Sequence, residues 1–344
     1  MISLRPVLGI DIGTNNTLIY KKGKGIVLNE PTVIAIDRNN DKTIGVGKQA
    51  KMMVGKTPSE IETINPIKSG AISDYGVTKM LLREYIRKAM GKTLIKPKCI
   101  FSIPSDATDV EKRAAIEAGN DSGAKKTYLI ENPLAAAIGS GLDISEPMGS
   151  MIVDIGGGTT NIAVISLGGV VVKKTIKIAG NTLNEEIIKF VKKKHNLEIS
   201  FSTAEKLKIN VGCGYGDDVI YNLEVKGRYL LTGLPVTLSI SSDNIYEALS
   251  ESISEIIDSI CSVLENTPPE LSTDIFKSGI VLSGGGAKLK GLDSLIDAVT
   301  GVKTYLAENA EECVVLGIGD IIESGLGFAE NKSSLFNNQN RRFD

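Results

Sequence analysis

The stretch MIVDIGGGTTNIAVI (residues 151–165) repeats the plan of VLGIDIGTNNTLIY (residues 7–20). Each copy consists of an apolar strand, an aspartate that leads a glycine turn, and a second strand that a tight glycine turn connects to a third. Glycine turns between apolar strands are common, so chance is an alternative, but the aspartate, glycines and threonines recur in register. The repeat therefore predicts two domains of like topology, each with an antiparallel hairpin feeding a sheet.

Helical and strand patterns alternate around the two copies, which favours an α/β fold with mixed sheets flanked by helices. Helices are expected at 77–90, 109–122, 133–140, 183–194 and 203–209 and along an apolar stripe at 245–264, and strands at 99–103, 128–130, 221–228 and 236–240.

Composition is typical of a soluble globular protein and excludes several functions. A length of 344 residues suffices for two lobes with separate cores, and mean hydropathy is near zero. The net charge of -2, with dispersed lysines and arginines, gives no reason to expect a nucleic-acid partner. Four scattered cysteines and a single histidine argue against disulfides, a zinc site and a Ser-His-Asp hydrolase. Because no signal peptide opens the chain, we expect a cytoplasmic location.

The two aspartate-led turns resemble the phosphate loops of the actin, Hsp70 and sugar-kinase superfamily. Glycines let backbone N–H groups approach phosphate oxygens, and threonine hydroxyls add donors. Asp11 and Asp154, each at a strand end, could orient waters around a magnesium ion that bridges the phosphates, although turn capping is an alternative role. The predicted ATP contacts are Asp11, Gly13, Thr14, Asn15, Asn16, Gly156, Gly157, Gly158, Thr159 and Thr160.

A third glycine turn follows the apolar run at 280–282, and the same resemblance puts it against the adenine and sugar. Its predicted contacts are Gly284, Gly285, Gly286 and Ala287. Glu205 and Lys208 stand three residues apart and so share one face of a helix. Taken alone they are typical of an exposed ion pair, whereas the resemblance implies contacts with the nucleoside.

Longer segments are similar to the MreB family, the rod-shape actins of bacteria. They are GIVLNEPTVIA (25–35), YLIENPLAAAI (128–138), VISLGG (164–169), TGLP (232–235) and LENTPPE (264–270). The match covers nearly the whole chain and implies an actin-like α/β fold that binds ATP with Mg2+. It also implies cytoskeletal homopolymers that govern cell shape or motility, in which subunits stack head to tail and protofilaments pair antiparallel.

The resemblance further implies two domains divided into four subdomains. Domain I would comprise 1–148 and 318–344, with IA at 1–33, 68–148 and 318–335 and IB at 34–67; domain II would comprise 149–317, with IIA at 149–182 and 242–317 and IIB at 183–241.

The hydrolytic site departs from the family pattern. MreB proteins usually read Glu-Glu-Pro where this chain has ENP (131–133), and the second Glu is expected to orient or deprotonate the attacking water. Asn132 can hydrogen-bond a water but cannot accept its proton, and general-base help is typically worth about 10²–10⁴-fold in rate. Thr159 is kept, and with Asp154 and Asn132 it forms the expected catalytic set. Asn161 replaces another usual Glu, while Asn181 and Ser69 stand where Asp is usual.

The changes at Asn132 and Asn161 predict slow ATP hydrolysis coupled to polymerisation, with a nucleotide-locked scaffold filament as the main alternative. Those at Asn181 and Ser69 are interpreted as neutral drift. A sugar or acetate kinase would need a second-substrate pocket with a catalytic base, and a chaperone ATPase would need a substrate-binding domain. Family filaments lie on the inner membrane face, and Leu94 and Ile95, ringed by lysines, are a plausible weak anchor at that surface. The alternative is that both simply begin the strand that ends at Pro104.

Overall fold

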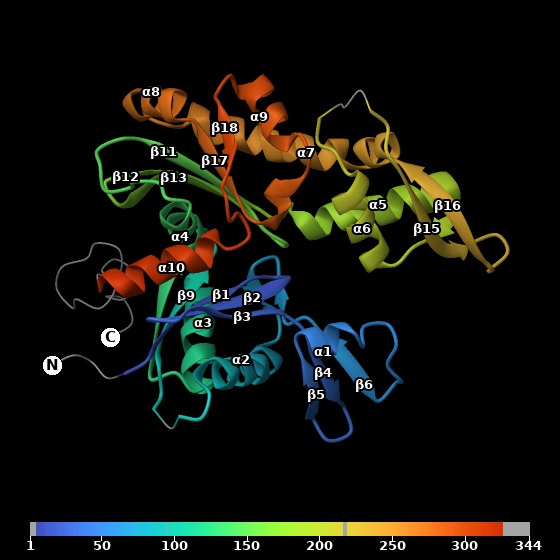
Figure 1. Ribbon diagram of the computed structural model, residues 1–344, viewed down its shortest axis with the longest axis horizontal. Coiled ribbons are helices and arrows are strands. Elements are labelled where there is room, and N and C mark those ends of the chain that lie inside the picture. Colours follow the sequence, from blue (N-terminus) through green and yellow to red (C-terminus); the bar gives the residue numbers. More distant parts are fainter. Residues whose placement is uncertain (1–4, 94, 216–218, 326–344) are drawn as a thin grey trace.

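The computed structural model describes residues 5–93, 95–215 and 219–325, which form two lobes (Figure 1). Each lobe is built on a five-stranded mixed sheet, in the order β10-β9-β1-β2-β3 for the first and β13-β12-β11-β17-β18 for the second. In both sheets, three consecutive antiparallel strands are extended by two strands parallel to the first of them. The duplicated topology that the sequence predicts is therefore confirmed.

The strands of the two large sheets occupy equivalent places. The first sheet comprises β1 (Val7–Ile12), β2 (Asn16–Lys21), β3 (Gly25–Pro31), β9 (Lys98–Ile103) and β10 (Lys126–Glu131). The second comprises β11 (Ser150–Ile155), β12 (Thr160–Ser166), β13 (Gly169–Ile176), β17 (Ile280–Ser283) and β18 (Thr304–Leu306). The β1–β2 and β11–β12 turns are the two aspartate-led repeats, so each lobe carries one of them.

Two helices join the lobes from between the sheets (Figure 1): α4 (Asn132–Gly139) and α10 (Cys313–Ser324). Their apolar side chains pack with residues from both sheets, including Ile100 of β9 and Ile152 of β11. A Cβ on Gly139 or Gly317 would overlap the backbone of the opposite helix, so glycine at both positions lets the two backbones touch. The lobes consequently share one apolar layer.

The remaining large helices pack around the sheets of the two lobes (Figure 1). They are α2 (Tyr75–Met90) and α3 (Asp109–Asp121) on the first sheet, and α5 (Gly180–His195), α7 (Ser242–Glu265), α8 (Pro269–Ser278) and α9 (Leu292–Thr300) in the second lobe. The apolar stripe predicted along 245–264 is the buried side of α7, where Ile245, Leu249 and Ile256 are fully enclosed.

Smaller elements sit at the outer ends of the lobes. One group is a three-stranded sheet of β4 (Ile34–Asp37), β5 (Lys42–Val46) and β6 (Ile61–Ile64) with α1 (Lys48–Lys51), followed by the hairpin β7 (Ile67–Lys68) and β8 (Ala71–Ile72). The other comprises β14 (Leu197–Glu198), β15 (Asn222–Tyr229), β16 (Pro235–Ser241) and α6 (Phe201–Val211). Separately, the short helix η1 (Gly285–Lys288) follows β17 of the second large sheet. The four subdomain boundaries stay a prediction.

The expected elements are present, with boundaries shifted by a few residues. The helix expected from residue 77 begins at Tyr75, because the Asp74 carboxylate accepts a hydrogen bond from the Val77 N–H and caps it earlier. No helix in the described ranges is both long and apolar enough to cross a membrane. Of the two residues expected at a membrane surface, Leu94 lies outside the described residues, and the side chain of Ile95 is 52% exposed.

Candidate functional site

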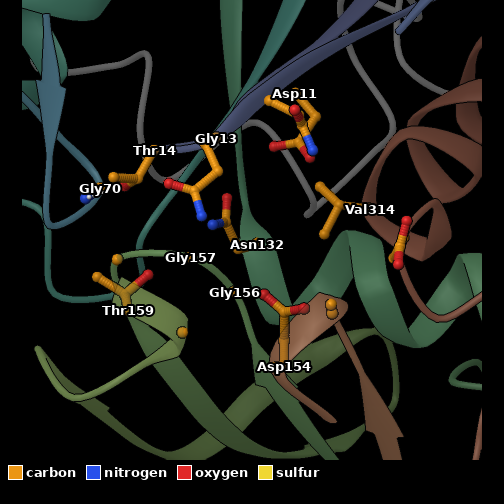
Figure 2. Close-up of a pocket in the computed structure, with 18 of the residues that line it drawn as sticks. Asp11, Gly13, Thr14, Gly70, Asn132, Asp154, Gly156, Gly157, Thr159 and Val314 are labelled. Carbon is orange, nitrogen blue, oxygen red and sulfur yellow. Dashed lines mark hydrogen bonds between the residues drawn. The ribbon is translucent and has the colours of Figure 1, made fainter. Parts of the chain in front are cut away.

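A cavity of about 250 Å³ lies between the lobes, where the two repeated turns face each other (Figure 2). Most of the residues predicted from the sequence line it. They are Asp11, Gly13, Thr14, Asn15, Asn16, Asn132, Asp154, Gly156, Gly157, Gly158, Thr159, Glu205, Lys208, Gly284, Gly285 and Gly286. Segments that are far apart in the sequence therefore converge on one polar cavity.

The first turn places a carboxylate at the end of β1. Asp11 accepts a 2.6 Å hydrogen bond from the hydroxyl of Ser102, which lies one residue before the end of the neighbouring strand β9. Burial raises the pKa of Asp11 to about 6; the Ser102 hydrogen bond opposes this rise, and the like charge of Asp154 adds to it. The turn itself is held by the Thr32 hydroxyl, which donates to the Gly13 carbonyl at 2.7 Å.

The second turn places a matching carboxylate at the end of β11. Asp154 is buried and accepts hydrogen bonds from the Ser283 hydroxyl at 3.0 Å and the Asn161 amide at 3.4 Å. Burial raises its pKa, and the two hydrogen bonds oppose the rise. Asp11 and Asp154 thus offer oxygen ligands of the kind that Mg2+ prefers. Within the described part of the chain no three acidic, histidine or cysteine side chains cluster. Two carboxylates nevertheless suit Mg2+, because this ion usually keeps several waters and is bound through one or two carboxylates.

The glycines of the second turn allow the lobes to touch. A Cβ on Gly158 would overlap the Thr14 hydroxyl of the first turn, and a Cβ on Gly157 would lie 2.6 Å from the Asn15 side chain. Gly156 is less crowded, since its nearest neighbour would be the Thr159 carbonyl oxygen at 3.3 Å. The triple glycine therefore serves close approach as well as access to backbone N–H groups.

The hairpin between β7 and β8 reaches the same place. Its turn residues Ser69 and Gly70 both have positive φ, at 47° and 74°, and the Gly70 N–H donates to the Thr14 hydroxyl at 3.1 Å. A Cβ on Gly70 would lie 2.8 Å from Pro104 and 3.1 Å from Thr159. The hairpin tip therefore packs against both turns.

The helix α6 supplies Glu205 and Lys208 at the other end of the cavity. The ammonium group of Lys208 donates to the Gly180 carbonyl at 2.7 Å, which differs from the exposed ion pair typical of this spacing. Burial lowers the pKa of Lys208 to about 8, and the charge of Glu205 opposes this. Gly284 has a φ of 83° and packs on Ile155, which brings the third glycine turn against the second.

Two predicted contacts do not line the cavity. Thr160 is fully buried, and its hydroxyl donates to the Ile178 carbonyl at 2.7 Å. Thr159 lies in the turn and lines the cavity, whereas Thr160 is the first residue of β12 and is enclosed. Ala287 is buried in the apolar core of the second lobe. Neither side chain lines the cavity, and contacts of these two residues with a nucleotide stay a prediction.

Asn132 begins α4 at the cavity wall, between the two turns in Figure 2. Its side-chain oxygen is buried and has no hydrogen-bond partner among the described residues. Before it, Glu131 forms a 3.1 Å ion pair with Lys173 of the second lobe. The substituted Asn161 donates to Asp154 and, at 3.4 Å, to the Thr159 hydroxyl. Asn132 thus presents an unused hydrogen-bond acceptor at the cavity wall.

The sequence reasoning missed several lining residues, including Lys51, Gly70, Ser102, Gly180 and Glu311. Ser102 could have been found, because it lies near the carboxyl end of a strand parallel to β1, and the carboxyl ends of parallel strands meet at one edge. Lys51 comes from α1 in the small outer sheet, and no sequence pattern connects it with the loops.

Two lobes of duplicated topology around a cavity with aspartate-led loops define the actin-like fold class. Comparison with solved structures agrees. The MreB5 protein of Spiroplasma citri, in structures bound to AMPPNP and to ADP, aligns with a TM-score of 0.90 at 34% identity, covering 96% of this chain and 99% of that one. The MamK double helical filament aligns with a TM-score of 0.80 at 20% identity, covering 93% and 99%, which shows a shared fold.

The family follows from sequence comparison. The family model for MreB/Mbl protein matches residues 5–327, so this chain belongs to the MreB/Mbl family of bacterial actin-like cytoskeletal proteins. Its relatives include the cell shape-determining protein Mbl of Bacillus subtilis, 45% identical over 318 residues, covering 92% of this chain and 96% of Mbl. The cell shape-determining protein MreB of Escherichia coli is 44% identical over 322 residues, covering 92% and 93%.

The contact between the two turns is testable by one added methyl group. We expect Gly158→Ala to lower the free energy of unfolding by about 1–3 kcal/mol, because the new Cβ would overlap Thr14 in a packed interface. Gly156→Ala is the matched control and should cost less, since its Cβ has only a tight neighbour at 3.3 Å. Denaturant titration of both variants measures the difference. Equal losses would contradict the close approach of the lobes.

Proposed function

We propose that this chain is an ATP-binding bacterial actin that polymerises into membrane-associated cytoskeletal filaments governing cell shape or motility, with slow ATP hydrolysis. The observation that carries the proposal is the convergence of two carboxylates and three glycine turns on one cavity between the lobes. Support comes from the solved structures of a relative bound to AMPPNP and ADP. Further support comes from relatives named cell shape-determining proteins.

In this proposal the phosphates lie between the turns at 13–16 and 156–159. Backbone N–H groups and the hydroxyls of Thr14 and Thr159 would donate to phosphate oxygens. Asp11 and Asp154 would hold Mg2+, which supplies charge neutralisation of the phosphates when bound. Glu205, Lys208 and the glycine turn at 284–286 would contact the nucleoside.

Slow hydrolysis is proposed from the chemistry of Asn132. The free side-chain oxygen of Asn132 can accept a hydrogen bond from a water in the cavity, but an amide cannot take the proton that an attacking water loses. Thr159 has a hydroxyl at the same wall and would orient that water. The chain would then bind ATP well and hydrolyse it without a general base. A scaffold filament with essentially no ATPase activity is the limiting case.

Self-association and membrane contact complete the proposal. Subunits would stack head to tail, in protofilaments that pair antiparallel, at the inner face of the cell membrane. The exposed side chain of Ile95, flanked by Lys92 and Lys96, suits a weak contact with anionic lipid, and many such contacts along a filament would add in avidity.

Filament formation tests the core of the proposal. Electron microscopy of micromolar protein with ATP and Mg2+ should show protofilaments. The Asp154→Ala variant should form none, or form them only at a much higher Mg2+ concentration, because it lacks a carboxylate that faces the cavity. The matched control is Asp143→Ala, which removes an exposed loop carboxylate bonded to Ser145. A wild-type chain that stays monomeric across salt and nucleotide conditions would contradict polymerisation. Wild-type behaviour of Asp154→Ala would instead remove the metal role.

The role of Asn132 is tested by restoring the carboxylate. Asn132→Glu should raise phosphate release with little change in ATP affinity, because a general base acts on the transition state. The gain should stay below the full general-base factor of about 10²–10⁴, since Asn161 also differs from the family pattern. Asn132→Gln is the control, since it lengthens the side chain without adding a proton acceptor. Wild-type release as fast as in relatives that carry the Glu would refute slow hydrolysis.

A further inference from the structure

One side-chain pair connects the first turn with the helix α5, whose start is hydrogen-bonded to the second turn. The amide of Asn15, in the first turn, donates a 2.9 Å hydrogen bond to the side-chain oxygen of Asn181, in the first turn of α5. The two residues belong to different lobes, so this bond spans the interface that bounds the proposed nucleotide site. Asn15 lines the cavity, and Asn181 stands behind the second turn.

Asn181 is held rigidly against the second turn by backbone hydrogen bonds. Its N–H donates to the Gly157 carbonyl at 2.8 Å, and the preceding Gly180 N–H donates to the Gly156 carbonyl at 3.1 Å. The Gly180 carbonyl in turn accepts the hydrogen bond from Lys208. The start of α5 therefore connects both ends of the cavity, and the Asn181 side chain is presented from a fixed backbone.

Gly157 leaves room for the Asn15 side chain to cross. A Cβ at this position would lie 2.6 Å from both Cγ and Nδ2 of Asn15, so any other residue would displace the amide. The Asn15 side chain thus lies over the second turn and is fixed at its far end by Asn181. Separation of the turns, which release of a ligand held between them requires, must break this bond.

On the basis of the proposed nucleotide site, we propose that Asn181 is a positioning residue that acts through Asn15. The amide pair holds the two phosphate turns closed over the bound nucleotide and slows its release. Both partners are neutral. The pair therefore adds no negative charge beside the phosphates, and it keeps its hydrogen bond across the physiological pH range, since neither amide titrates there.

The experiment measures the dissociation rate of a fluorescent ADP analogue from the Mg2+-loaded full chain. Asn181→Ala and Asn15→Ala should each accelerate release by roughly 2- to 12-fold, the rate equivalent of one neutral hydrogen bond. The double variant should be no faster than the faster single variant, because both remove the same bond. Asn181→Asp keeps an acceptor oxygen for Asn15 and should restore slow release relative to Asn181→Ala.

Thr182→Ala is the matched control, because it removes a hydrogen bond from the same helix turn that stays within the second lobe, to the Lys177 carbonyl. It should leave the release rate unchanged. Unchanged release in both single asparagine variants, or multiplicative effects in the double variant, would overturn the proposal.

A readout without nucleotide separates this proposal from the nucleotide site itself. In the nucleotide-free chain, amide hydrogen exchange at 13–16 and 156–158 should rise in Asn181→Ala but not in Thr182→Ala. If the wild-type chain binds no nucleotide, the proposed function fails. The exchange data still test whether the Asn15–Asn181 pair holds the two turns together. Equal amide exchange in the wild-type chain, Asn181→Ala and Thr182→Ala would overturn the proposed role of the pair.

Discussion

Two carboxylates of like charge, withdrawn from solvent at one cavity, set the main physical constraint on this molecule. Burial raises the pKa of both Asp11 and Asp154. Because the folded-state pKa of Asp11 lies above its unfolded value, ionising it lowers the stability of the fold as the pH rises from 3.8 to about 6. Hydrogen bonds from Ser102 and Ser283 offset part of this cost. The cation proposed to lie between the lobes would remove more of it.

The two lobes pack closely against each other on both sides of this cavity. The shared apolar layer of α4 and α10 joins the sheets on one side, where glycines let the two helices touch. On the other side, the glycines of the second turn admit Thr14 and Asn15 of the first. Contacts of one or two side chains therefore hold the two turns together beside the cavity.

Much of the fold and of the cavity lining could be predicted from the sequence, because both depend on a local pattern that occurs twice. The duplicated strand–turn–strand pattern carries both topology and loop chemistry, and so the two sheets and the cavity-facing aspartates followed from it. Side-chain direction could not be predicted in this way. Thr160 shares its motif with Thr159 but points into the core, and Ala287 turns away from the cavity after the glycines beside it. The cross-lobe partners of Asn15 and Glu131 depend on how the lobes pack, which no local pattern encodes.

The most direct test of the central claim is a structure of the full chain with a non-hydrolysable ATP analogue and Mg2+. Our account predicts phosphate density between the turns at 13–16 and 156–159, with the ion on the side of Asp11 and Asp154 and the nucleoside beside Glu205 and Lys208. Density for the analogue elsewhere, or a cavity that stays closed to it at saturating concentration, would contradict the account.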